Sequence, residues 1–184
     1  VGKSSFINYL IGKEVSRVGT GMPVTQGFDV YQYDNISGIP LQIFDSKGLE
    51  VMDYERIKKD IFDFVGKRCG SEDVHEWIHS IFYCVNAGGS RIEPEEIEFI
   101  KKLSGKISQT LHIILTHCKK DADGERKSKE LADCISSQLN DRDIKVYFVN
   151  SVRTETRVAE FEPFGREEIL DQIFELLWSD IAHK

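Results

Sequence analysis

The residues with the clearest chemical potential stand at the start of the chain, in the run Gly2-Lys3-Ser4-Ser5. A glycine lets a phosphate approach backbone N–H groups, a lysine can reach the β- and γ-phosphates of a nucleotide, and a hydroxyl directly after it can bind Mg²⁺. The following residues can continue as a helix, whose positive amino-terminal end would point at the same phosphates. The run therefore predicts a phosphate site made of Gly2, Lys3, Ser4 and Ser5, with Ser4 as a metal ligand.

This run matches the second half of the P-loop motif G-x-x-x-x-G-K-[ST], a turn that joins a strand to a helix. We expect the first glycine of that motif and the strand before it to precede Val1, so that the chain starts inside the motif. A G-K-S-S tetrapeptide by itself can also be no more than the start of a helix. The residues further along the chain decide between these two interpretations.

Polar residues able to bind a ligand follow several segments with strand-like sequences. In α/β folds, ligands bind at the carboxyl ends of the strands. We therefore expect these residues to lie around one site, together with a threonine from the Gly- and Pro-rich loop at 19–27. The residues concerned are Thr25, Asp45, Gly48, Thr116, His117, Asn150 and Ser151.

Strand-like and helix-like segments alternate along the rest of the chain, which predicts an α/β fold in three layers, a mostly parallel sheet with helices on both faces. The β-rich runs at 28–33 and 41–44 predict a hairpin. Apolar runs predict buried strands at 81–85, 111–115 and 146–149. Helical spacing predicts helices at 54–66, 94–103, 128–139 and 167–178, and a short helix after Ser71 that carries Val74, Trp77 and Ile78.

The composition fits a single globular domain over residues 1–184, with 40% hydrophobic and 30% charged residues. The net charge of −7 argues against direct binding of nucleic acid, because neutralising phosphates needs a basic face. The apolar runs are far shorter than the roughly 20 residues that span a bilayer, so we expect no transmembrane helix. The four cysteines show no paired spacing, which favours reduced thiols and a cytoplasmic location.

Taken in order, these residues resemble the motifs of P-loop GTPase domains of the translation-factor superclass, nearest the Era-like and septin-like branch. Gly2-Lys3-Ser4-Ser5 resembles the first guanine-nucleotide motif, Thr25 the switch I threonine, and Asp45-x-x-Gly48 the third motif. Thr116-His117 stands where the base-reading motif belongs, and Asn150-Ser151-Val152 where the S-A-K loop belongs. The resemblance covers nearly the whole chain, as a G domain lacking its first strand.

The resemblance implies GTP and GDP as ligands, together with Mg²⁺. It assigns charge neutralisation to Lys3, metal binding to Ser4, Thr25 and Asp45, and contact with the γ-phosphate to Thr25 and Gly48. The catalytic residues would then be Lys3, Thr25 and Gly48. Leu49 stands where many GTPases carry a glutamine that orients water, so we expect slow hydrolysis and an effector protein that the sequence does not identify.

The base-reading segment departs furthest from the family pattern [NT]-K-x-D. In the register Thr116-His117-Cys118-Lys119, a lysine stands where a carboxylate should accept hydrogen bonds from guanine. The register Cys118-Lys119-Lys120-Asp121 restores the lysine and the carboxylate but places a cysteine first. We favour the first register, because a threonine directly after the strand matches the family. Guanine selectivity should then be weak, unless Asp121 or Asp123 supplies the carboxylate.

Other interpretations stay open. The septin-like resemblance also allows a nucleotide-dependent assembly module that forms homo-oligomers or a membrane scaffold. A degenerate P-loop domain that binds a partner protein and no nucleotide is a second possibility. His75 and His79, flanked by Cys69 and Cys84, have the spacing of a metal site, although Cys84 falls in a predicted buried strand. Residues 119–127 are most simply a solvated loop, which can also close over a base.

The resemblance carries one geometric expectation for the sheet. In such folds the strand before the phosphate loop is central, and here it would precede Val1. We therefore expect the strands that end at Asp45 and Val85 to lie about two strand spacings apart, roughly 10 Å, without hydrogen bonds between them.

Overall fold

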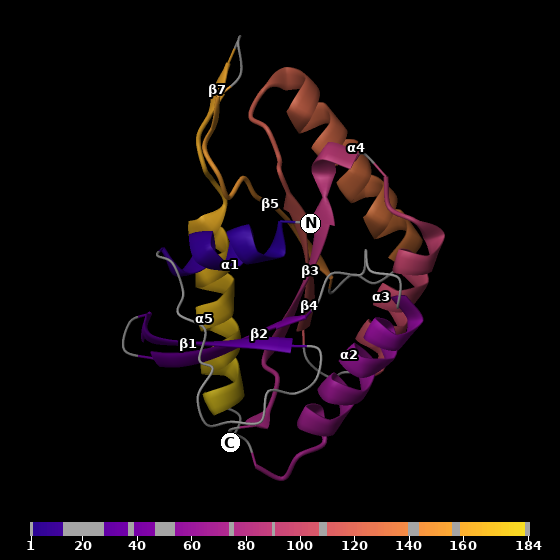
Figure 1. Cartoon of the computed structure of the whole chain (residues 1–184), viewed down its shortest axis with the longest axis vertical. Helices are drawn as coiled ribbons and strands as arrows, with labels where there is room; N and C mark the ends of the chain where they lie inside the picture. Colours follow the sequence, from indigo (N-terminus) through magenta and orange to yellow (C-terminus); the bar gives the residue numbers. More distant parts are fainter. Residues whose placement is uncertain are drawn as a thin grey trace.

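The computed structural model describes residues 2–12, 28–36, 39–46, 54–73, 76–89, 91–106, 110–139, 144–155 and 159–182 of the chain. Helices surround a set of central strands (Figure 1). In chain order the elements are α1 (Lys3–Ile11), β1 (Phe28–Ile36), β2 (Ile39–Ser46), α2 (Tyr54–Cys69), β3 (Ser80–Asn86), the 3-10 helix η2 (Ala87–Gly89), α3 (Pro94–Lys106), β4 (Thr110–Thr116), α4 (Ala122–Leu139), β5 (Lys145–Phe148), β6 (Thr154–Glu155), β7 (Glu160–Phe161) and α5 (Arg166–Ala182).

The larger sheet of the described strands consists of β3, β4 and β5, in that order and all parallel. Ile81 of β3 lies opposite Leu111 of β4, and Ile113 of β4 lies opposite Val146 of β5. Residues 111–116 of the middle strand are all buried. A strand covered on both faces can be apolar throughout, which explains why this run shows no alternation. The parallel strands predicted at these three places are confirmed.

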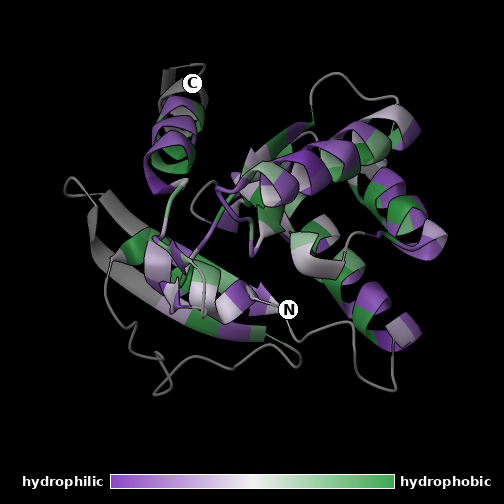
Figure 2. Ribbon diagram, turned by 90° about the horizontal axis from the view of Figure 1, so that it is seen from above, coloured by the Kyte–Doolittle hydropathy of each residue, from purple (hydrophilic) through white to green (hydrophobic). Residues whose placement is uncertain are grey.

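Helices cover both faces of this sheet. On one face, Val65 of α2, Ile100 of α3 and Ile135 of α4 belong to a single apolar cluster with alternate residues of β4. On the other face, Phe6 of α1 and Ile169 of α5 pack against β4 and β5. Each helix carries both apolar and polar residues, as Figure 2 shows, and buries the apolar ones against the strands. The predicted three-layer α/β fold is confirmed.

Strands β1 and β2 form the predicted antiparallel hairpin, in a sheet of their own. Phe28, at the start of β1, lies opposite Ser46, at the end of β2. Phe28 and Phe44 pack on Phe64 of α2, with ring centroids 4.3 and 5.0 Å away. Among the described strands no ladder joins β2 to β3, in agreement with the expectation that they are not hydrogen-bonded. Their separation by two strand spacings stays a prediction.

Helix α4 begins at Ala122, six residues before the predicted start, so most of the expected loop at 119–127 is helical. Asp121 Oδ1 accepts a hydrogen bond of 2.6 Å from the N–H of Gly124, which caps the helix. The next turn is stabilised by ion pairs of Arg126 with Asp123 and Glu130. These first turns face solvent and carry no apolar periodicity, which is why the pattern missed them.

Three smaller expectations were wrong or only partly right. Helix α2 continues past Gly66 to Cys69, because the backbone bond from Gly70 N–H to Gly66 O extends the last turn. The short helix expected after Ser71 is confirmed only in part: Ser71 Oγ accepts the N–H of Asp73 at 3.2 Å and Glu76 belongs to a 3-10 turn. Trp77 and Ile78 lie instead in irregular chain leading into β3, where the Trp77 indole donates to Ser71 O at 2.8 Å; Val74 lies outside the described residues. Within β3 only Val85 is buried, because β3 is at the edge of its sheet.

The short strands β6 and β7 pair antiparallel in a small hairpin that extends from the body of the molecule (Figure 1). Two residues per strand are too few for a sequence pattern, so this hairpin was not predicted. Arg153, just before it, forms ion pairs with Glu155, Glu160 and Glu162. No helix in the described part of the chain is long and apolar enough to cross a membrane.

Candidate functional site

The phosphate run lies at the amino-terminal end of α1, directly against the loop after β4. Gly2 has a φ of 88°, in the left-handed region that favours glycine, and its carbonyl accepts the N–H of Phe6 at 2.8 Å. A Cβ on Gly2 would lie 3.0 Å from Nε2 of His117 and 3.1 Å from Oγ1 of Thr116. Two segments more than a hundred residues apart in the chain therefore meet here.

Ser4 and Asp45 are in contact, as their proposed common role requires. The Ser4 hydroxyl donates to Oδ2 of Asp45 at 3.2 Å, and Asp45 is buried near the carboxyl end of β2. A hydroxyl and a carboxylate oxygen side by side suit Mg²⁺, which binds few protein ligands and keeps several waters. Ser4 and Asp45 would hold that ion; the third proposed ligand, Thr25, lies outside the described residues, as does Gly48.

The charges of Lys3 and Asp45 both influence the pKa of Cys84, near the end of β3. Cys84 is half-buried, and the loss of water around its thiol raises the pKa of that thiol to about 12, while the charge of Lys3 opposes this rise and that of Asp45 adds to it. The positive charge of Lys3 and the negative charge of Asp45 therefore both lie near the Cys84 thiol, at the end of the sheet. All four cysteines are free thiols. Among the described residues there is no group of three His, Cys, Asp or Glu that could bind a metal, and His75 lies outside them.

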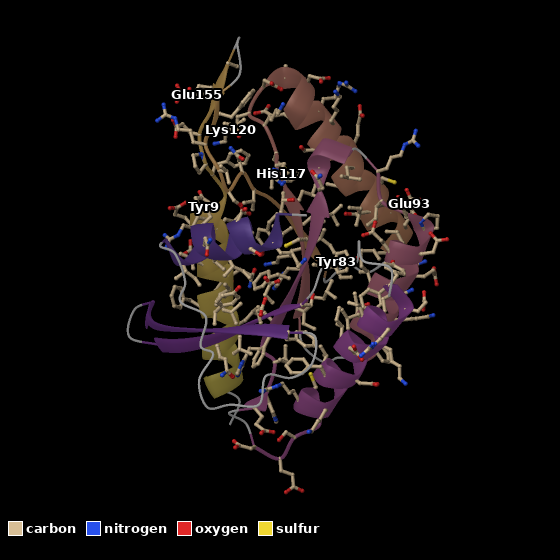
Figure 3. The ribbon with its side chains drawn as sticks, viewed as in Figure 1. Tyr9, Tyr83, Glu93, His117, Lys120 and Glu155 are labelled. Atoms are coloured by element: carbon tan, nitrogen blue, oxygen red, sulfur yellow. The ribbon has the colours of Figure 1, made fainter. Side chains whose placement is uncertain are left out.

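The loop after β4 alternates between buried and exposed side chains. Thr116 ends β4, and its Oγ1 donates to the carbonyl of Val85 at 3.3 Å. His117 is exposed, with a left-handed φ of 60° that few residues other than glycine adopt. Cys118 is buried again, and Lys119 is exposed. Figure 3 shows His117 where the strands end, near the amino-terminal end of α1.

Asn150 and Ser151 differ in their hydrogen bonds. Asn150 is buried, pairs with Phe164 through two backbone hydrogen bonds of 3.2 and 3.0 Å, and donates from Nδ2 to the carbonyl of Glu162 at 3.0 Å. The Oγ of Ser151 is buried and has no hydrogen-bond partner. Ser151 and Ser5 line the same open pocket of about 780 Å³, with Asn8, Tyr9, Ile11, Gly12, Val152 and Arg166. A ligand in this pocket could satisfy the Ser151 hydroxyl.

Arg166 is a site residue that the sequence did not reveal. From the first turn of α5, its Nε donates to the carbonyls of Tyr9 and Leu10, at 3.0 and 2.8 Å. These carbonyls belong to the last turn of α1, where a positive charge is favourable. Arg166 therefore joins α5 to the helix that begins at the phosphate run, although no local sequence signal marks this contact.

Comparison with known proteins places this site in context. Residues 1–120 match the family described as 50S ribosome-binding GTPase. The chain is 30% identical over 106 residues to the tRNA modification GTPase MnmE of Clostridioides difficile (strain 630), which covers 58% of this chain and 21% of that protein. The chain thus spans about a fifth of the length of this relative.

Two solved structures share the fold. The bacterial selenocysteine-specific elongation factor EF-Sec superposes with a TM-score of 0.57 at 18% identity, over 97% of this chain and 27% of that one. A putative nucleolar GTP-binding protein 1 from Plasmodium falciparum gives a TM-score of 0.52 at 17% identity, over 99% of this chain and 83% of that one. At these identities the likeness establishes the fold alone.

Proposed function

Because the chain belongs to the 50S ribosome-binding GTPase family, we propose that it is a guanine-nucleotide-binding switch with slow, Mg²⁺-dependent GTP hydrolysis. The observation that carries this proposal is the contact of 3.2 Å between Ser4 Oγ and Asp45 Oδ2. These two residues are 41 positions apart and were assigned to one metal site from their motifs. Their contact supports a common role in holding the ion of a nucleotide complex.

Each residue of the site has a defined role in this proposal. Gly2 and Ser5 border the phosphates, and Lys3 neutralises their negative charge at the start of α1. Ser4 and Asp45, with Thr25, hold Mg²⁺. When bound, the ion would neutralise charge that develops on the phosphate oxygens. Thr116, His117, Asn150 and Ser151 border the base and ribose.

The hairpin supports the switch part of the proposal. Thr25 precedes β1 by three residues and Gly48 follows β2 by two, and the ends of these strands pair as Phe28 with Ser46. The hairpin thus brings the chain ends that lead to Thr25 and Gly48 together, next to Asp45. Both residues could then respond to the same γ-phosphate. Leu49 cannot orient water, so we propose that hydrolysis is slow without a partner.

The assignment to the Era-like and septin-like branch, a cytoplasmic location, an effector protein and homo-oligomer formation are further parts of the proposal. The relative named as a tRNA modification GTPase is about five times longer than the matched region. We therefore do not propose that this chain has the activity of that whole protein.

Replacing Lys3 tests the proposal. In the full-length protein, Lys3→Ala should weaken GTP binding by at least about a hundredfold, because charge-assisted hydrogen bonds to phosphate are lost. Isothermal titration calorimetry measures the affinity, and circular dichroism checks that the fold is intact. Lys59→Ala, at an exposed position of α2, is the matched control and should bind like the parent. Unchanged affinity of Lys3→Ala would contradict the assignment of the phosphate site.

A further inference from the structure

Residues 160–165, which lead from β7 to the start of α5, are held against the end of β5. Phe164 exchanges two backbone hydrogen bonds of 3.2 and 3.0 Å with Asn150. The carbonyl of Glu162 accepts a third, of 3.0 Å, from Nδ2 of Asn150. Gly165 has a left-handed φ of 93°, and a Cβ there would collide with the last carbonyl oxygen of β5. Glycine alone fits this position, so the path of the segment past Asn150 is fixed.

The same segment supports the loop after β4. The ring centre of Phe161 lies 5.2 Å from Nζ of Lys119, and that of Phe164 lies 4.5 Å from Nζ of Lys120. An ammonium group over the face of an aromatic ring is attracted by the ring electrostatically. In the view of Figure 3, Lys120 lies between His117 and the β6–β7 hairpin. The loop after β4 and the loop after β5 therefore both rest on one short segment.

These two loops are the ones that lie next to the phosphate run. His117, in the loop after β4, lies against Gly2, and Ser151, in the loop after β5, lines one pocket with Ser5. In the proposed function the two loops border the base and ribose of the nucleotide. A displacement of residues 160–165 would therefore move both loops at once, although the segment itself carries none of the residues assigned to the nucleotide.

The β6–β7 hairpin, which leads into this segment, is stabilised by Arg153. Its strands pair Glu155 with Glu160, so two carboxylates lie directly opposite each other, which is unfavourable on a sheet. Side chains two positions apart in an extended chain share one face, and this brings Arg153 and Glu162 to the same face. Arg153 forms ion pairs with all three carboxylates, at 3.6 Å to Glu155, at 3.3 Å to Glu162, and with Glu160. One guanidinium therefore offsets the repulsion within the hairpin.

We propose that Arg153 is a positioning residue of the nucleotide site: it stabilises the β6–β7 hairpin, and through residues 160–165 it keeps both loops in place and slows the release of the nucleotide. This inference rests on the proposed nucleotide site and adds what determines the lifetime of the bound state. A hairpin with two residues per strand is marginally stable by itself. Loss of the guanidinium therefore loosens it, and the loops that border base and ribose then open more often.

The rate at which fluorescent GDP leaves the full-length protein, in the presence of excess unlabelled GDP, tests this inference. Arg153→Ala should accelerate release by about fivefold, the order expected when exposed ion pairs that act together are lost. Fluorescent GDP and a fluorescent non-hydrolysable GTP analogue should be affected equally, because the two loops border base and ribose.

A second substitution and a control make the test specific. Glu155→Gln, added to Arg153→Ala, should restore much of the slow release, because it removes the pair of facing carboxylates. Lys101→Ala is the matched control: it breaks an exposed ion pair of 3.0 Å with Glu98 on α3 and should leave the rate unchanged.

The possible outcomes separate the two proposals. Unchanged release from Arg153→Ala would overturn the inference and leave the proposed function intact. A change confined to the GTP analogue would also overturn it, since Arg153 would then act on the γ-phosphate. Faster release that Glu155→Gln does not reverse would do the same, because general loss of structure would explain it. Failure of the native protein to bind either nucleotide would overturn the proposed function and the inference together.

Discussion

At the scale of single residues, the site depends on contacts between positions far apart in the chain. Ser4 meets Asp45, and Gly2 lies against Thr116 and His117. The sequence predicted these meetings, because the carboxyl ends of strands in an α/β fold share one edge. The sequence could not predict the hydrogen bonds from Arg166 of α5 to the last turn of α1, because they depend on how α5 packs rather than on any local pattern.

His112, in the middle of β4, is a buried residue whose chemistry affects stability. It is fully buried, both ring nitrogens lack hydrogen-bond partners, and its ring stacks on Phe82 with centroids 5.4 Å apart. Burial, and to a lesser extent the charge of Lys145, lowers the pKa of His112 to about 4. The neutral form therefore belongs to the folded state, and protonation favours unfolding.

We predict a loss of stability in acid that depends on His112. Below its ordinary pKa of about 6.5 the unfolded chain binds a proton that the folded chain does not, so stability falls as the pH decreases from about 6.5 towards 4. The expected loss is about 3 kcal/mol, from 1.36 kcal/mol per pH unit. Urea unfolding of the native protein and of His112→Leu between pH 7 and 4.5 measures the difference. Parallel pH profiles for the two proteins would contradict this explanation.

At the scale of elements, burial decided which parts of the fold could be predicted. Strand β4 was evident because both of its faces are covered, so its run of apolar residues is unbroken. The start of α4 was not evident, because its first turns are exposed and depend on a cap from Asp121 and on ion pairs of Arg126. Hydrophobic periodicity reports only elements that pack against a core.

Arg166 links two helices, and its loss should weaken both stability and nucleotide binding. Arg166→Ala removes the donors to Tyr9 and Leu10 at the end of α1. We expect a decrease in the free energy of unfolding of about 1–2 kcal/mol, and a several-fold weaker affinity for GTP, because α1 begins at the phosphate run. Thermal unfolding and calorimetry measure the two effects. Arg126→Ala, which breaks only exposed ion pairs of α4, should change stability much less than Arg166→Ala does; equal effects of the two substitutions would argue against the link.

At the scale of the whole molecule, two apolar clusters hold the sheet between its helix layers, while the candidate ligand residues that the structure describes, such as Ser4, Asp45 and His117, lie where the strands end. Such an arrangement keeps the scaffold rigid and leaves the connecting segments to respond to ligand. The pairing of Phe28 with Ser46 directs the chain towards Thr25 and Gly48 from one end of the β1–β2 hairpin. A ligand group that contacts both residues would therefore act on the hairpin as a unit.

This arrangement leads to a prediction for Thr25. In the full-length protein, Thr25→Ala should leave GDP affinity nearly unchanged and remove most of the difference between the GTP and GDP states, because only the γ-phosphate contacts the switch residues. Limited proteolysis of residues 19–27 with a non-hydrolysable GTP analogue or GDP measures this difference, and titration calorimetry measures the GDP affinity. Ser16→Ala, a hydroxyl in the same connection between α1 and β1, is the matched control. If the native protein is cleaved there equally fast with either nucleotide, residues 19–27 do not sense the γ-phosphate, and the chain binds nucleotide without acting as a switch.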